Sequence, residues 1–329
     1  MIHSAPFLVL ACLGRFQDGA RVAAPAALRA SEGYTLFAPM SGGTTYLLDA
    51  AGAVAHAWKT DSPAAGFVAL LDNGNLLRSA RAARNLDLPG GGQAGLLQEL
   101  DAVGNLVWSF ELGGGQYSLH HDVELTPYGT ILAIAWDRKT SAEALAAGRD
   151  PAGLRGDSFW PDAVLEIEPL PAGGGNVVWE WHAFDHVVQE RFPERATHGS
   201  VRAHPELIDL NCDLAQDPAP DAAELAEMRA TGYVGEERDR RPRPPDWLHT
   251  NSIAYDASRD VILLGSRNLS EVWVIDHSTS TAEAAGHTGG RFGRGGDLLA
   301  RWGNPRNHAG DGERQLFHQH DAHWIPAGL

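Results

Sequence analysis

A short pattern recurs four times along the chain, and it constrains the fold more than any other feature of the sequence. In each copy a turn containing glycine is followed by apolar residues and by an aromatic residue six positions after the glycine. The copies occupy residues 52–58 (GAVAHAW), 104–110 (GNLVWSF), 175–181 (GNVVWEW) and 296–302 (GDLLARW). An apolar strand pattern ending in an acid precedes each copy, closely for three of them and at a longer, Gly-rich distance for the fourth. Each copy therefore predicts two antiparallel strands around a turn.

A second predicted strand pair lies ahead of three of these copies. It begins at residues 67–71, 123–126 and 253–255, and each time a polar or Gly turn leads into another apolar strand. The unit thus has four strands and recurs at about 50 to 70 residues or more, which is typical of a β-propeller. A β-sandwich is the alternative, but its strands seldom recur in one fixed internal order. We therefore expect an all-β fold of the β-propeller type.

The number of units predicts an open ring. The first unit has three strands, three complete units follow, and a fifth begins at residues 317–326. Because propellers close their ring to cover the edge strands, we expect a chain truncated after about four blades, with one or two more encoded downstream of Leu329. The Pro-rich, charged segment 187–245 does not fit the repeat and is expected to be an insertion with a short helix at 222–229. The predicted organisation is an N-terminal segment 1–32 and a propeller domain 33–329.

Charge and cysteine content exclude several classes of protein. The 26 Lys and Arg against 42 Asp and Glu give a net charge of −16, which argues against nucleic acid or an anionic membrane as partner. No apolar stretch reaches the roughly 18 to 20 residues of a membrane span. The two cysteines, Cys12 and Cys212, cannot form a disulfide framework or a thiolate metal cluster, and whether they pair stays open.

The N-terminus carries an ambiguous export signal. Residues 5–13 (APFLVLACL) are similar to the apolar part of a signal peptide, and residues 9–12 (VLAC) are loosely similar to a lipoprotein processing site. The positively charged start of such signals is missing, so a remnant signal and a mis-started N-terminus both remain open.

Histidines begin the first strand of three consecutive units, in LHHDVEL, WLHTNSI and HQHDAHW. The first strand of a blade runs nearest the central channel, so equal positions in successive blades face one another. We therefore expect His121, His249 and His320 to converge at one mouth of the channel. Separate, hydrogen-bonded structural histidines are the alternative.

Arg267 distinguishes an anion site from a metal site among these histidines. It ends the second strand of the blade that carries His249, and a guanidinium there would oppose a divalent cation and favour sulfate or phosphate oxygens. We therefore expect no metal at the histidines, although three imidazoles also suit zinc or copper. The alternative for Arg267 is a salt bridge to Glu271 or Asp276.

Nucleotide-dependent transfer and α/β-hydrolase chemistry have no support. The sequence has no Walker loop, no GxGxxG between a strand and a helix, and no GxSxG elbow. Asp122 and Asp321, which directly follow channel histidines, are candidates to orient an imidazole, although alternation along a strand would point neighbouring side chains to opposite faces.

Taken together, the motifs resemble those of a known family. GYTLFAP, HHDVELTPYGTILAI, VVWEWHAFDH, DWLHTNSIAYD, LLGSRNLSEVWVIDH and QHDAHWIP resemble, in order, the bacterial arylsulfotransferases, which need no activated nucleotide sulfate. The resemblance extends from about Gly33 to the end of the chain.

This resemblance implies a six-bladed periplasmic propeller, often homodimeric, that moves a sulfuryl group from a phenolic sulfate to a phenol without metal or cofactor. By motif, His320 matches the nucleophile that becomes transiently sulfated, in a ping-pong mechanism. His249, Arg267 and one histidine of HHD match the other active-site positions. We take the latter as His121, because it precedes an Asp as His320 does, and we assign His120 and Asn251 as candidate substrate-binding residues.

Two other classes of function stay open. One is a propeller that binds carbohydrate or protein without catalysis, because fold alone does not determine function. The other is a metal-dependent hydrolase or oxidoreductase that uses the histidines. A sulfatase, which transfers the sulfuryl group to water, is a variant of the leading hypothesis.

Overall fold

A computed structural model describes residues 33–39, 42–82, 91–212, 222–230 and 245–325. The predicted N-terminal segment 1–32 lies outside the described residues, as does Cys12. Its pairing with Cys212, which is buried, therefore stays open. None of the described helices is long and apolar enough to cross a membrane.

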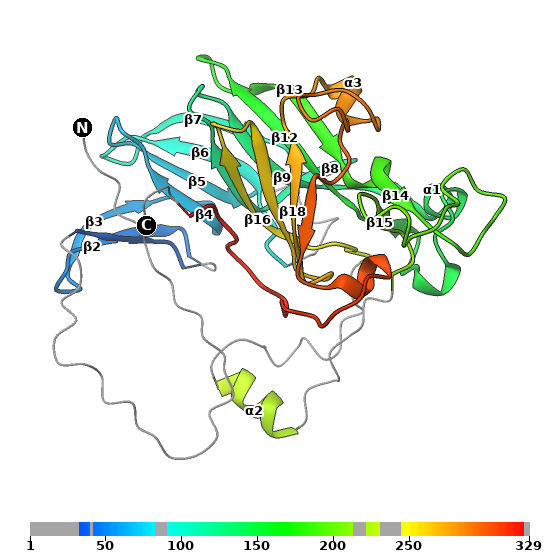
Figure 1. Ribbon diagram of the computed structural model, residues 1–329. Helices are drawn as coiled ribbons and strands as arrows, with labels where there is room; N and C mark the ends of the chain where they lie inside the picture. The colour runs from blue at the N-terminus through cyan, green and yellow to red at the C-terminus, as the bar shows by residue number, and fades with distance from the viewer. Residues whose placement is uncertain (1–32, 40–41, 83–90, 213–221, 231–244, 326–329) are drawn as a thin grey trace.

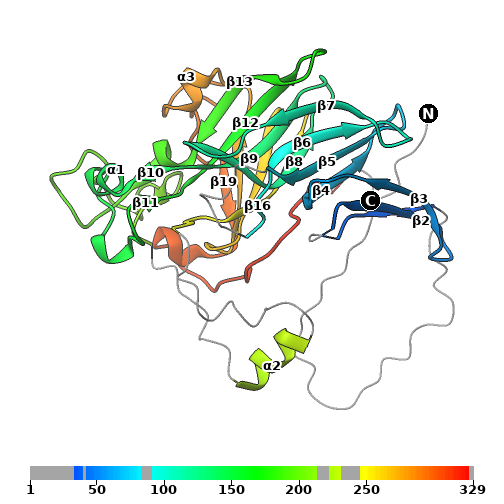
Figure 2. The same cartoon turned by 180° about the vertical axis from the view of Figure 1, so that it is seen from behind.

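Four antiparallel sheets dominate the described chain, and in each the strands pair in chain order. The first holds β1 (Thr35–Phe37), β2 (Thr44–Leu48) and β3 (Val54–Lys59). The second holds β4 (Ala64–Leu70), β5 (Leu76–Arg81), β6 (Gly95–Leu100) and β7 (Leu106–Glu111). The third holds β8 (Tyr117–Leu125), β9 (Ile131–Asp137), β12 (Asp162–Pro169) and β13 (Gly175–His182). The fourth holds β16 (Thr250–Asp256), β17 (Val261–Ser266), β18 (Glu271–Asp276) and β19 (Ala300–Trp302). The all-β prediction is confirmed, and the sheets follow one another in a fan (Figures 1 and 2).

The sequence repeat corresponds to the last strand of each sheet, β3, β7, β13 and β19. In the first three sheets, one tryptophan of this last strand makes a bond to the next sheet. Its indole N–H donates to a backbone carbonyl in the turn before the last strand of that next sheet. These bonds join Trp58 Nε1 to Asp101 O (3.0 Å), Trp108 Nε1 to Gly174 O (2.8 Å) and Trp181 Nε1 to Gly296 O (2.7 Å). The last strands therefore supply both the hairpins of the repeat and, through their tryptophans, contacts between neighbouring sheets.

The core lies between the sheets, because each middle sheet buries both faces. Leu97 and Leu165 belong to a cluster between the second and third sheets. Val164, Leu264 and Trp273 belong to a larger cluster between the third and fourth. Burial on both faces explains the nearly continuous apolar runs of β9 and β17, whose residues are all buried.

The first strands of the sheets, β4, β8 and β16, lie side by side. The carboxylate of Asp122 in β8 accepts a hydrogen bond from Ile253 N in β16 at 3.1 Å. A Cβ at Gly66 in β4 would lie 2.5 Å from the carbonyl oxygen of His121, so only glycine permits this close approach of β4 to β8. Each of the three strands contains a register shift, which indicates a β-bulge at the same place in each unit.

Two excursions leave the sheets. One, which the repeat did not predict, lies between β9 and β12 and contains β10 (Lys139–Thr140), α1 (Ser141–Ala146), η2 (Pro151–Gly153) and β11 (Ser158–Phe159). The other follows η3 (Ala183–His186) and is the predicted insertion 187–245, with β14 (Val187–Val188), β15 (Ile208–Asp209) and α2 (Ala222–Ala230), which matches the expected helix at 222–229. The connection from β18 to β19 contains α3 (Thr281–Ala284), and η5 (Pro305–His308) follows β19.

The prediction of a strand at residues 317–326 is wrong for the part that is described, 317–325, which has no strand conformation. The amide of His318 bonds to the side-chain oxygen of Ser270 at 3.2 Å, and the Gln319 side chain donates to the carbonyls of Ser266 and Glu271 at 3.1 and 2.7 Å. The segment is therefore attached to the fourth sheet through side chains and not through a backbone ladder.

Candidate active site

His121 and His249 meet where β8 and β16 lie side by side. Their ring centroids are 4.5 Å apart, with an angle of 67° between the ring planes. Both have left-handed backbone conformations, with φ of 55° and 51°. Such values are uncommon outside glycine and cluster at functional sites. Two histidines of different sheets, both with left-handed backbones, thus meet at this place.

Asp246 orients His249. The His249 Nδ1 atom lies 2.5 Å from Oδ2 of Asp246, whose side chain is only 3% exposed. Burial opposes ionisation of this carboxyl, but the charge and hydrogen bond of His249 outweigh it and hold the pKa of Asp246 below its usual value. An ionised Asp246 only accepts, so Nδ1 of His249 carries the hydrogen and Nε2 is left for the site.

His120 lies behind His121 and is shielded from solvent. Its ring stacks on Trp136 with centroids 4.4 Å apart, its Nδ1 lies 2.8 Å from Nδ1 of His121, and its Nε2 lies 3.3 Å from a carboxylate oxygen of Asp162. The His120 side chain is 0% exposed. This places the predicted substrate-binding residue beside His121 and away from the solvent-facing side of the site.

Positive charge and burial keep His121 neutral. Burial, followed by the charges of His120, His249, His320 and Arg267, holds the pKa of His121 well below its usual value. His121 is therefore a neutral imidazole at neutral pH, in contact with His249.

His320 lies on the exposed side of this group. Its Nδ1 lies 3.2 Å from the carbonyl oxygen of His318; because a carbonyl only accepts, Nδ1 is the protonated nitrogen and the lone pair is on Nε2. Partial desolvation, then the charges of Arg267 and His249, lower the pKa of His320. His320 is thus a neutral imidazole with a free nitrogen at neutral pH.

Arg267 is half-buried, and among the described residues it forms no salt bridge with Glu271 or Asp276. Its guanidinium donates to Asn268 at 3.1 Å, while Glu271 is bound by Arg301 at 2.6 Å. The alternative role as a salt-bridge residue is therefore not found among the described residues, and the cation remains beside the histidines.

Asn251 holds the segment that carries His320. Its side-chain amide donates to the carbonyl oxygen of Gln319 at 2.8 Å, and the residue is only 6% exposed. Its position links β16 directly to the neighbour of the predicted nucleophile.

Asp122 does not orient an imidazole. Its two carboxylate oxygens accept from the backbone amides of Val123 and Ile253, at 3.0 and 3.1 Å. Burial raises its pKa to about 7, in spite of these bonds. As expected from the alternation of side chains along a strand, Asp122 points away from the imidazole that precedes it in the sequence.

Sequence reasoning missed two parts of the site, Asp246 and the glycine pair Gly91 and Gly92. Asp246 precedes His249 by three residues, a spacing that could have drawn attention to it. A Cβ at Gly91 would lie 3.1 Å from the His249 ring, and one at Gly92 would overlap the His121 ring. The backbone of these glycines therefore forms a wall that only glycine permits.

The fold and the site together define a chain of antiparallel sheets in which two histidines of adjoining inner strands meet and an arginine follows the next strand. The family model described as arylsulfotransferase (ASST) matches residues 22–284. Because this is most of the chain, the protein belongs to the arylsulfotransferase family. The match includes His121, His249 and Arg267 and ends before His320.

The solved structures that are similar to this chain are distant. They include hydrazine synthase of Kuenenia stuttgartiensis (12% identity, 82% of this chain and 58% of that one, TM-score 0.39). The Cps50 (Swd1) β-propeller domain of Myceliophteria thermophila has 12% identity over 83% of this chain and 69% of its own, with TM-score 0.31. BamB of Moraxella catarrhalis has 13% identity over 82% and 72%, with TM-score 0.24. The chain thus spans less than two thirds of the hydrazine synthase chain, and no curated protein matches it significantly.

Proposed function

We propose that this protein is an arylsulfate sulfotransferase that moves a sulfuryl group from a phenolic sulfate to a phenol through a sulfohistidine at His320. The observation that supports the proposal is the contact between the rings of His121 and His249, whose centroids are 4.5 Å apart, together with the lowered pKa of His320, to which desolvation and then the charge of Arg267 contribute. The six-bladed ring, periplasmic location and dimer implied by the family resemblance belong to the same proposal.

In the first half-reaction, Nε2 of neutral His320 attacks the sulfur of the donor. An N–S bond forms, the S–O bond to the aryl group breaks, and the leaving oxygen takes a proton from His249. Asp246 supports this role, because its carboxylate stabilises the imidazolium form of His249 at 2.5 Å.

In the second half-reaction, the acceptor phenol replaces the released phenol. Its oxygen attacks the sulfur, the N–S bond breaks, and the hydroxyl proton passes to Nε2 of His249. His320 returns to the neutral state and His249 to the protonated state, so the two halves balance.

Arg267 and His121 stabilise the negative charge on the sulfuryl oxygens. A guanidinium presents planar pairs of N–H donors that suit sulfate-like oxygens. Such stabilisation, aimed at charge that develops in the transition state, is usually the largest single contribution to this kind of catalysis. His121 remains neutral and acts by hydrogen bonding, and the buried His120 positions it.

The test is nitrophenolate release from nitrophenyl sulfate by the full-length protein, with and without phenol. Release that phenol stimulates, together with formation of phenyl sulfate, supports transfer. Release that does not depend on phenol indicates a sulfatase, and no release by folded protein would favour a binding module.

A further inference from the structure

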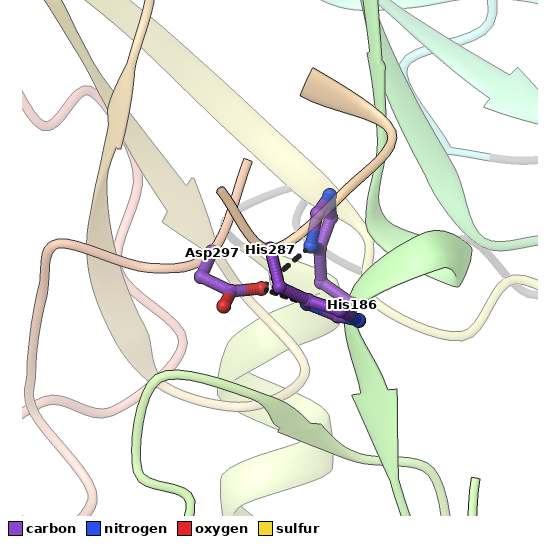
Figure 3. A group of neighbouring side chains, drawn as sticks. All are labelled: His186, His287 and Asp297. Carbon is purple, nitrogen blue, oxygen red and sulfur yellow. Dashed lines mark hydrogen bonds and ion pairs between the residues drawn. The ribbon is translucent and has the colours of Figure 1, made fainter. Parts of the chain in front are cut away.

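Away from the histidines of the proposed active site, a second group joins the third and fourth sheets. His186 lies at the end of η3, just after β13, whereas His287 and Asp297 lie on the connection between β18 and β19 (Figure 3). Their nearest ligand atoms all lie within 4.8 Å of one another, the only such group of three His, Cys, Asp or Glu side chains in the described parts of the chain.

The Nδ1 atoms of both imidazoles face the same carboxylate oxygen of Asp297. Nδ1 of His186 lies 2.9 Å from Oδ1 of Asp297, and Nδ1 of His287 lies 2.7 Å from that same oxygen. Three potential ligands from two chain segments thus converge on one point, as Figure 3 shows.

The protonation of His186 makes this convergence unusual. Nε2 of His186 lies 2.8 Å from the carbonyl oxygen of Ala284, which can only accept, so this nitrogen carries a hydrogen. In a neutral ring, Nδ1 then presents a lone pair to the Asp297 carboxylate. Two acceptors then face each other at 2.9 Å, an arrangement that a cation bound by both atoms would satisfy.

A histidine whose second nitrogen donates to a carbonyl is the usual arrangement of a metal-binding imidazole, because that bond fixes the tautomer and aims the lone pair. The surroundings hold His186 in this orientation. Its ring stacks parallel to Trp181 at 5.7 Å, and Trp181 donates to Gly296 O at 2.7 Å, next to Asp297. A Cβ at Gly296 would lie 2.5 Å from Nε2 of His186, so the backbone approach requires glycine.

The group is buried on the side of His186 and Asp297 and accessible to solvent on the side of His287. The side chains of His186 and Asp297 are 0% and 9% exposed, whereas that of His287 is 59% exposed. Three protein ligands with an open position for water suit tetrahedral Zn²⁺, and two imidazoles exclude the oxygen-only preference of Ca²⁺ and Mg²⁺.

The geometry points to a zinc-type divalent metal site formed by Nδ1 of His186, Nδ1 of His287 and the Asp297 carboxylate. The metal connects the end of the third sheet to the β18–β19 connection of the fourth, so its effect is to stabilise the contact between the sheets. The site is separate from the proposed sulfuryl transfer and does not depend on it.

The test is titration of Zn²⁺ into the full-length protein after treatment with a chelator, by calorimetry and elemental analysis. We compare the wild type with His287→Ala, which removes an exposed side chain and should leave folding intact. The matched control is His204→Ala, because exposed His204 also faces a carboxylate, Glu206, at 3.0 Å but belongs to no group of three potential ligands among the described residues.

We expect one Zn²⁺ at this site in the wild type and in His204→Ala, and affinity at least about tenfold lower in His287→Ala. Zinc should also raise the unfolding temperature of the wild type, but not that of His287→Ala. Equal affinity and equal thermal shift in wild type and His287→Ala, with both folded by circular dichroism, would overturn the proposal. So would zinc binding that persists in His287→Ala and disappears in His320→Ala.

Discussion

Asp246 Oδ2 lies 2.5 Å from His249 Nδ1, so a buried carboxylate fixes the tautomer of an imidazole that faces the site. The other oxygen of this carboxyl group, Oδ1, accepts a hydrogen bond from the indole N–H of Trp136 at 3.3 Å. Trp136 also stacks on His120, so one network connects the two sheets behind both histidines. The orientation of His249 is therefore a property of this network and not of its own strand alone.

Replacement of Asp246 tests this network. In Asp246→Asn the amide can present a donor to Nδ1, which favours the wrong tautomer of His249, as in the triad logic of Ser-His-Asp enzymes. We expect kcat for aryl sulfate turnover to fall by at least about 100-fold, with little change in KM, because Asp246 is buried and acts through His249. Circular dichroism provides the control for folding, and unchanged kcat in a folded variant would contradict the proposed role.

The pH dependence of activity tests how the charge of Arg267 affects the pKa of His320. A neighbouring cation disfavours the protonated imidazole, and the pKa of His320 is accordingly lowered from 6.5, by partial desolvation first and Arg267 second. Because the neutral ring is the nucleophile, we expect activity to be retained below pH 6.5 and lost only as the pH falls through the lowered pKa.

In Arg267→Gln the midpoint of this acidic loss should rise toward pH 6.5, whatever the absolute rate. Arg259→Gln is the control, since that guanidinium pairs with Asp256 at the other end of β17. A midpoint that stays the same in Arg267→Gln would show that its charge does not reach His320.

Gly92 tests the packing around His121. It has φ of +72°, and a Cβ there would overlap the His121 ring, so Gly92→Ala must displace that ring. We expect kcat/KM to fall by about 100-fold, the size of effect that a small misplacement of a catalytic group produces.

Gly74→Ala separates this effect from backbone strain. Gly74 has φ of +83° but no atom within 4 Å of the added Cβ. It should lose about 1 to 2 kcal/mol of stability and keep its activity. Similar activities for the two variants would contradict the close contact with His121.

Trp181 tests the contact between sheets. In Trp181→Phe the buried carbonyl oxygen of Gly296 loses the indole donor at 2.7 Å, and a smaller ring fills the site. We expect the free energy of unfolding to fall by about 1 to 3 kcal/mol in denaturant titration, with chelator present so that bound metal contributes nothing.

Trp302→Phe is the matched control, because Trp302 occupies the same place in the fourth repeat but is 58% exposed. Its cost should stay within about 0.5 kcal/mol. Equal losses in the two variants would mean that the bond between sheets adds no stability.

The repeat made most of the fold predictable. The spacing of Gly52 and Trp58 and its three counterparts identified the last strand of each of the four main sheets, because hairpins and half-buried strands leave local patterns. The excursion between β9 and β12 was missed because its strands are only two residues long, and residues 317–325 were assigned as strand although strand pairing depends on a neighbour and not on composition.

The candidate site was partly predictable for the same reason. Register in the first strands identified His121 and His249, which the structure brings into contact. Asp246, Gly92 and the burial of His120 depend on contacts between sheets, for which the sequence has no periodic signal. The metal-ligand group of His186 and Asp297 joins residues 111 apart and left no motif at all.

The central claim is the covalent intermediate at His320, and the most direct measurement is mass spectrometry of protein quenched in acid-free solution after reaction with an aryl sulfate in the absence of acceptor. We predict the added mass of one SO₃ group on the peptide that contains His320, its loss when phenol is added, and its absence in His320→Ala. His323→Ala, which changes an exposed histidine of the same segment, should retain it. Turnover with no added mass, or with the added mass on another residue, would contradict the account.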